Sequence, residues 1–195
     1  MKISDITNSA LSLGKNAAFR RALKCVLLDE CEFDHDGVTI RKEMPDSSGW
    51  TFAGLNQSSD GLPVDAQGNV LATTDWIVNK YEQNYWNSCK CNSLLTPLNI
   101  ILFIQAVNEG NETVAILLQR ALNDYGNKIL EDGIIGPHTI SAVMSNNNIY
   151  DLCRAFISKS KAYYIAVVRS NPNKQKDLQG WFNRLDKLQE EFLTE

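Results

Sequence analysis

The ten residues Leu28–Gly37, LDECEFDHDG, carry five carboxylates at the end of a stretch with helical apolar spacing. A cluster of this kind usually forms a solvated loop. Among these five, Glu30 is the candidate for a catalytic role, because a residue at the end of an apolar helix is partly shielded from water. Partial burial disfavours the charged form of a carboxyl group, and neighbouring carboxylates act in the same direction. Glu30 is therefore a candidate for an acid that protonates a glycosidic oxygen, with a solvated helix end as the alternative.

The same stretch could instead bind calcium. Five residues occupy positions 1, 3, 5, 6 and 12 of an EF-hand-like loop, namely Glu32, Asp34, Asp36, Gly37 and Glu43. The first position holds Glu rather than Asp, and Pro45 stands where an exit helix should begin. Because matches of this size arise by chance in acidic loops, we expect no metal site and no cofactor, and a calcium-binding regulatory module stays an alternative.

Composition and charge exclude two classes of partner. The 195 residues have a net charge of −4, and the densest basic cluster is the pair Arg20–Arg21, which argues against binding to nucleic acid. The longest apolar run, 98–104, is too short to span a membrane.

Asp5 and Asn8 interrupt the N-terminal region, so we expect no signal peptide and synthesis in the cytoplasm. Five cysteines do not suggest a disulfide framework.

Apolar spacing predicts a mainly α fold. Helical periods cover 17–30, 74–86, 97–109, 112–124, a helix from Pro137, 148–169 and 176–193. Thr74 or Asp75 is the expected N-cap of the second of these helices. Residues 31–72 are rich in glycine and turn residues and predict a loop-rich insert with a small β hairpin after the first long helix. An insert of this length is uncommon unless it is functional, and it would face Glu30.

Two stretches near Glu30 resemble motifs of the glycoside hydrolase family 108 muramidases. Asp46–Leu55, DSSGWTFAGL, is similar to the signature D-P-G-G-x-T-x-x-G-[IL]. Glu30–Phe33 stands where the family has E-G-G-Y at the end of its first helix. Cys31–Glu32 in place of Gly-Gly, and Ser47–Ser48 in the turn, leave a catalytically inactive peptidoglycan-binding protein as an open alternative.

The resemblance continues to residue 192. The similar stretches are Tyr85–Trp86, Cys91–Leu94, Phe103–Gly110, Leu118–Leu122, Asp132–Thr139, Tyr163–Tyr164 and Gly180–Arg184. It implies a lysozyme-like α fold, with a catalytic region at 1–95 and a helical peptidoglycan-binding region at 96–195, packed as one compact unit.

The resemblance also implies an activity, hydrolysis of the β-1,4 bond between N-acetylmuramic acid and N-acetylglucosamine. By position Glu30 would be the general acid, and Asp46 and Thr51 are candidates for holding the attacking water. The candidates for binding peptidoglycan are Trp50, Tyr85, Asn108, Gln119, Asp132 and Thr139, whereas Trp86 and Trp181 are expected in the core. Such a protein would act in the periplasm or cell wall, after export or lysis, in phage lysis or in the secretion of proteins or toxins.

Overall fold

A computed structural model describes residues 1–194, apart from the side chain of Met44. The chain divides into two compact units, Met1–Asn87 and Ser88–Glu195. This division falls before the boundary expected after residue 95. The expectation that the two parts form one compact body stays a prediction.

The mainly α fold is confirmed, and a small three-stranded sheet follows the first long helix as expected. The helices of the first unit are α1 (Ile3–Ser12), α2 (Ala17–Glu30), α3 (Gln57–Asp60) and α4 (Thr74–Tyr81), which continues into a π-helical turn (Glu82–Trp86). The strands are β1 (Glu43–Asp46), β2 (Gly49–Phe52) and β3 (Leu55–Asn56), antiparallel in the order β1-β2-β3.

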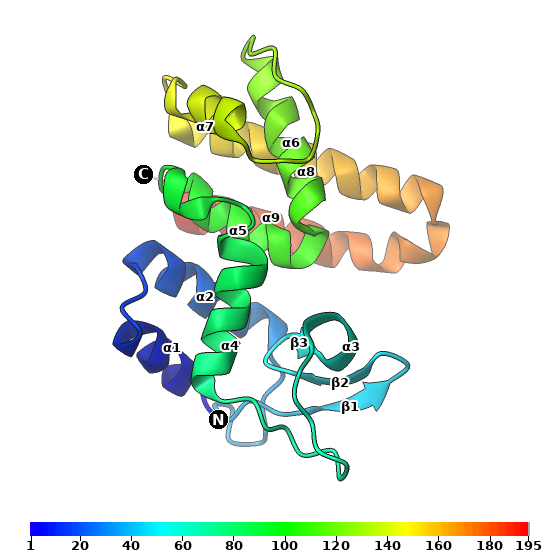
Figure 1. Cartoon of the computed structure of the whole chain (residues 1–195). Helices are drawn as coiled ribbons and strands as arrows, with labels where there is room; N and C mark the ends of the chain where they lie inside the picture. The colour runs from blue at the N-terminus through cyan, green and yellow to red at the C-terminus, as the bar shows by residue number, and fades with distance from the viewer. Residues whose placement is uncertain (195) are drawn as a thin grey trace. The chain divides into compact units, whose positions relative to one another are not determined.

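Helices α1, α2 and α4 make the apolar core of the first unit, since α1 packs against both of the others (Figure 1). Phe19, Leu23 and Val26 of α2 are buried, as their spacing predicts. Trp86 is confirmed as a core residue, and its ring meets that of Phe19 edge to face, with centroids 5.3 Å apart. Helix α1 was not predicted, although Ile6 anchors it in the core.

Side-chain caps fix where two of these helices begin. Asn16 precedes α2 and accepts a hydrogen bond from the backbone N–H of Phe19 at 2.8 Å. Thr73 precedes α4 and accepts from the N–H of Trp76 at 3.1 Å. The expected cap at Thr74 or Asp75 was therefore wrong by one or two positions, because the hydroxyl of Thr73 reaches the free N–H groups of the first turn.

In the residues described, the regular secondary structure of the second unit consists of helices alone. It comprises α5 (Leu98–Glu109), α6 (Asn111–Asp124), α7 (Pro137–Met144), α8 (Ile149–Ser170) and α9 (Leu178–Leu193), with 3-10 turns at Cys91–Ser93 and Pro172–Asp177. Helix α5 is buried on all sides from Leu98 to Ala106. Helices α8 and α9 lie side by side, joined by the second 3-10 turn, and α8 also packs against α6 (Figure 1).

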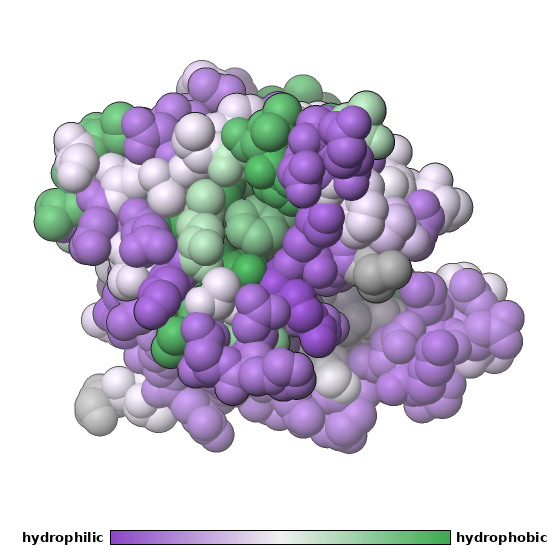
Figure 2. Space-filling model, turned by 90° about the horizontal axis from the view of Figure 1, so that it is seen from below, coloured by the Kyte–Doolittle hydropathy of each residue, from purple (hydrophilic) through white to green (hydrophobic). Residues whose placement is uncertain are grey.

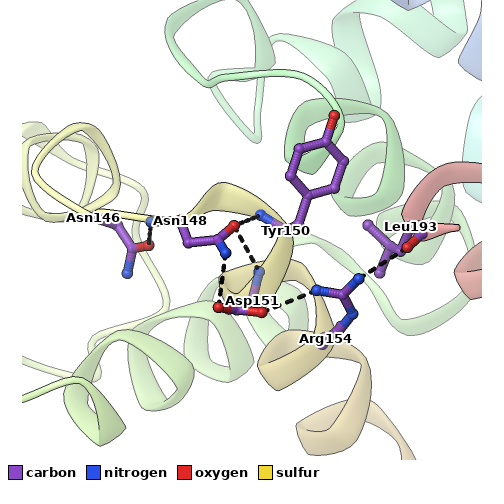
Figure 3. Close-up of polar contacts among 6 residues, drawn as sticks. All are labelled: Asn146, Asn148, Tyr150, Asp151, Arg154 and Leu193. Carbon is purple, nitrogen blue, oxygen red and sulfur yellow. Dashed lines mark hydrogen bonds and ion pairs between the residues drawn. The ribbon is translucent and has the colours of Figure 1, made fainter. Parts of the chain in front are cut away.

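A polar network closes one end of the α8–α9 pair (Figure 3). The Asn148 side chain caps α8 by accepting from the N–H groups of Tyr150 at 3.0 Å and Asp151 at 3.4 Å. Arg154 donates to Asp151 at 2.9 Å and to the carbonyl oxygen of Leu193 at 3.0 Å. The last turn of α9 is thus tied to the first turns of α8.

No helix in the part of the chain described is long and apolar enough to cross a membrane. The five cysteines are free thiols, and Cys89, Cys91 and Cys153 are buried.

Candidate functional site

Glu30 is the last residue of α2, and its carboxyl oxygen Oε1 is buried from solvent. The backbone becomes extended at Cys31, whose N–H still bonds to the carbonyl oxygen of Leu27 at 3.2 Å. The chain therefore leaves the helix immediately after Glu30, and the side chain is fixed at the helix end.

The turn between β2 and β3 lies directly against Glu30. Ala53 and Gly54 have positive φ angles of 51° and 71°, and the Ala53 carbonyl oxygen accepts a hydrogen bond from the Tyr81 hydroxyl at 2.9 Å. A Cβ atom on Gly54 would lie 2.6 Å from the Tyr81 hydroxyl oxygen and 3.2 Å from the Glu30 Cβ. Only glycine fits here, and its small size allows the sheet to approach the acid.

We expect Gly54→Ala to lower the free energy of unfolding by about 2 kcal/mol or more, because it adds a steric clash to an unfavourable backbone angle. Chemical denaturation measures the loss. Gly61→Ala is the matched control, since Gly61 has nearly the same φ of +70° but open space at its Cβ position. Equal losses in the two variants would show that Tyr81 and Glu30 impose no steric constraint at position 54.

Negative charge surrounds the end of α2. Burial, followed by the charges of Glu30 and Glu43, raises the pKa of the Cys31 thiol to about 12. Burial, followed by the charges of Asp60 and Glu30, raises the pKa of Tyr85 to about 12. Glu30 therefore shares its neighbourhood with Glu43 and Asp60, and Cys31 keeps its proton at neutral pH and is a poor nucleophile.

Asp46 and Thr51 both lie on the β1–β2 hairpin, joined by a chain of hydrogen bonds. The Asp46 carboxylate accepts from the Ser48 N–H at 2.8 Å and from its hydroxyl at 2.6 Å, and these bonds lower the Asp46 pKa. The Asn56 amide donates to the Ser48 hydroxyl oxygen at 2.9 Å and to that of Thr51 at 3.1 Å. Asp46 is exposed and ionised at the hairpin turn, and Asn56 is an organising residue that the sequence analysis missed.

The two aromatic candidates of the first unit are both half-buried. The Lys42 ammonium lies 3.8 Å from the centre of the Trp50 ring, and Gly68 packs against the edge of the same ring. One face of Trp50 is thus already covered, and the residue holds neighbouring segments together. The Tyr85 ring lies 6.0 Å from the Tyr81 ring, on the side of Asp60 and Glu30.

Residues 32–43 do not form an EF-hand. Both oxygens of the Asp36 side chain are used within its own turn, by the N–H groups of Val38 and Thr39 and by the Thr39 hydroxyl. Glu32 pairs with Arg41, and strand β1 takes the place of an exit helix. Among the described residues, no group of three or more His, Cys, Asp or Glu side chains could hold a metal ion. The arrangement does not support the calcium-binding alternative.

An apolar groove of about 360 Å³ lies beside this acidic loop, between α1, α2 and the loop itself. Its apolar lining comes from Ile3, Leu28, Phe33 and Val38. Figure 2 shows apolar side chains gathered among hydrophilic ones on the face seen from below. Phe33 and Val38 of the loop line the groove, where Val38 is 48% exposed, while Glu32, Asp34 and Asp36 are exposed to solvent.

Three candidates of the second unit meet, but they bond to one another. The Gln119 amide donates to Asp132 at 2.7 Å, to the Ile134 carbonyl oxygen at 3.0 Å and to the Thr139 hydroxyl oxygen at 3.3 Å. Gln119 and Thr139 are buried. This cluster fixes the loop before α7, which borders a pocket of about 470 Å³ with exposed Ile134. All three side chains line that pocket, and Asp132 is exposed to solvent there.

Asn108 lies in a different pocket, at the end of α5, where its side-chain oxygen accepts a hydrogen bond from Arg184. Beside it is Glu109, a buried acid that the sequence analysis missed. Its only signal in the sequence was its place at the end of the most apolar helix, the same signal that singled out Glu30.

Comparison with known proteins supports peptidoglycan as the class of partner. Residues 113–186 match the family described as "Predicted Peptidoglycan domain". The structure of Brucella abortus SagA is similar in fold, with a TM-score of 0.68 over 91% of this chain and 96% of that chain, at 18% sequence identity. No curated protein matches the sequence significantly. At this identity the likeness to SagA shows the fold alone.

Proposed function

We propose that the protein is a peptidoglycan hydrolase, an N-acetyl-β-D-muramidase that cleaves the β-1,4 bond between N-acetylmuramic acid and N-acetylglucosamine. The position of Glu30 carries the proposal. Its side chain ends α2 with one oxygen buried, against the Gly54 turn and among further carboxylates. Partial burial and nearby negative charge favour a neutral acid, which glycosidic cleavage requires.

In the proposed reaction Glu30 gives its proton to the glycosidic oxygen while the bond from that oxygen to C1 of N-acetylmuramic acid breaks. A water molecule adds to C1 and passes one proton to a carboxylate base, for which the ionised Asp46 is the candidate. Asp46 and Thr51 are the candidates for holding this water. The bonds through Ser48 and Asn56 fix both side chains on one rigid hairpin, as a positioning role requires.

Digestion of purified peptidoglycan tests the proposal. A muramidase releases new reducing ends at N-acetylmuramic acid, whereas a glucosaminidase releases them at N-acetylglucosamine, so reduction and analysis of the products distinguishes the two. Binding to the wall without new reducing ends would instead support an inactive peptidoglycan-binding protein. The region similar to the peptidoglycan domain, 113–186, does not contain Glu30 and supports binding to the wall under either candidate.

Removal of divalent metal ions with a chelator should change neither the digestion of peptidoglycan nor the stability of the protein. The side chains of the 32–43 loop bond within the loop, and strand β1 follows it in place of an exit helix. We therefore expect the same melting temperature and the same rate with EDTA, with added calcium, or with neither. A melting temperature that falls with EDTA and recovers with calcium would establish the calcium-binding alternative.

For the biological role we propose action on the cell wall, reached after export or lysis, in phage lysis or in the secretion of proteins or toxins. The acidic net charge of −4 means that recognition of an anionic wall depends on local binding sites rather than on overall attraction.

A further inference from the structure

A pocket of about 320 Å³ in the second unit is lined by residues of α5, α8 and α9 and of the 3-10 turn that joins the last two. Its lining includes Asn108 at the end of α5, Tyr163 and Tyr164 on α8, Trp181 and Arg184 on α9, and Lys174 in the 3-10 turn. Three of the stretches that carry the family resemblance, 103–110, 163–164 and 180–184, therefore meet in one cavity.

Aromatic rings make one wall of the pocket. The rings of Tyr164 and Trp181 stack with centroids 4.6 Å apart and planes inclined by 22°, and the Tyr163 ring lies 5.7 Å from that of Tyr164. Trp181 was expected in the core, but it is half-buried and contributes surface to the pocket. The expectation was wrong because Trp181 is not enclosed by other residues. Tyr164 covers one face of its indole, and the side chain also borders the pocket.

Two positively charged side chains, those of Arg184 and Lys174, line the same pocket as these rings. Arg184 donates to the Asn108 side-chain oxygen, 76 positions away in sequence, and this bond holds the guanidinium at the pocket. Lys174 has a side chain 50% exposed, with Asp177 3.8 Å away. A guanidinium and an ammonium next to an apolar surface suit a carboxylate carried on an apolar or peptide stem. Two cationic side chains therefore border the pocket, and the carboxyl groups beside them are those of Glu109 and Asp177.

Glu109 also lines this pocket, and its ionisation changes the charge there. Both carboxyl oxygens are buried from solvent. Burial raises the Glu109 pKa to about 7, against the opposing effects of Tyr164, Ser160 and Arg184. Below that pH Glu109 is neutral, and above it a negative charge faces Arg184. The positive charge available to a ligand is therefore larger on the acidic side of pH 7.

We propose that this pocket binds a free carboxylate of the peptide stem of peptidoglycan, held by Lys174 and Arg184 against the wall of Tyr164 and Trp181. The proposal rests on the proposed function for peptidoglycan as the substrate class. Within that polymer the glycan chain offers hydroxyl and N-acetyl groups, and its lactyl carboxyl groups are amide-linked wherever a peptide is attached. Free carboxylates are therefore found on the peptides, and a cationic pocket selects them.

The test is a calorimetric titration of the full chain carrying Glu30→Gln. The ligands are a synthetic stem tetrapeptide with free carboxylates, the same peptide with its carboxylates amidated, and peptide-free glycan oligomers. We expect Lys174→Gln to weaken binding of the acidic peptide about tenfold, the worth of one charge-assisted contact. Lys176→Gln, in the same exposed turn, is the matched control and should bind like the parent.

Two further measurements distinguish a pocket that binds a carboxylate from one whose charged side chains only stabilise the fold. The amidated peptide should bind weakly and show no difference between the two lysine variants. Affinity for the acidic peptide should fall between pH 6 and pH 8 in the parent, and Glu109→Gln should remove most of this fall.

The proposal is overturned if the amidated peptide or the glycan binds as tightly as the acidic peptide, if Lys174→Gln and Lys176→Gln behave alike, or if the acidic peptide does not bind. Digestion of walls by the unmodified protein is measured separately. Carboxylate-dependent binding without digestion would reject the proposed muramidase activity and support the carboxylate site. Digestion without peptide binding would support the activity and reject the carboxylate site.

Discussion

Glu30→Gln should abolish digestion of purified peptidoglycan, with a loss of at least about 100-fold, because general acid catalysis contributes factors of this size. Glutamine keeps the shape of the side chain but has no proton to give to the glycosidic oxygen. The free energy of unfolding should change by no more than about 1 kcal/mol, as for a polar change at a half-buried site. Release of reducing ends and the melting temperature measure the two effects.

Glu32→Gln is the matched control, two residues further along the chain. The Glu32 side chain is exposed and pairs with Arg41, and an exposed ion pair of this kind contributes little to stability. We expect this variant, and Asp34→Asn, to keep most of the activity. If Glu30→Gln still digests walls while folding normally, Glu30 is not the acid, and Glu43 and Asp60 become the carboxyl groups to test.

Glu109 should make the stability of the protein fall as pH rises. Its folded pKa of about 7 lies above the ordinary value of 4.5, so between these values the folded state holds a proton that the unfolded state has lost. Stability from this group is complete below the unfolded pKa and is lost as pH rises through the folded pKa. The difference amounts to at most about 3 kcal/mol.

Glu109→Gln should remove this dependence, because the amide stays neutral throughout. Urea denaturation of the parent and the variant at pH 4.5, 6, 7 and 8 measures the difference between them, which should shift in favour of the variant as pH rises. Glu190→Gln, an exposed acid on α9, is the control and should follow the parent. Parallel stability curves for the parent and Glu109→Gln would mean that Glu109 ionises normally in the folded state.

The candidate site of the first unit was found in part from sequence. Glu30 stood out because it ends an apolar helix beside a long polar insert, and α2 does end at that residue. Asp46 and Thr51 became candidates only through the resemblance, and the structure places both on the β1–β2 hairpin and links them through Ser48 and Asn56. Tyr81, which holds the turn against Glu30, gave no local signal, because nothing in its own helix indicates that its hydroxyl reaches Ala53.

By itself the sequence determined the helices from α2 onward that carry a clear apolar period, and the faces they bury, whereas α1 was not predicted. Apolar residues at spacings of three and four commit one side of a helix to the core, as at Phe19, Leu23 and Val26. Pro137 after Gly136 likewise marked the start of α7, since that position needs no N–H donor. These features depend on neighbours within a few residues, and the sequence displays those neighbours directly.

Only the tertiary structure decided which polar groups meet. Asn108 and Arg184 are 76 positions apart, and Gln119 joins Asp132 and Thr139 across a loop. The burial of both Glu109 oxygens depends on α8 and α9 packing over the end of α5. The pKa of a carboxyl group depends on every element that excludes water from it, so the raised pKa of Glu109 could be recognised only after the chain had been folded around it.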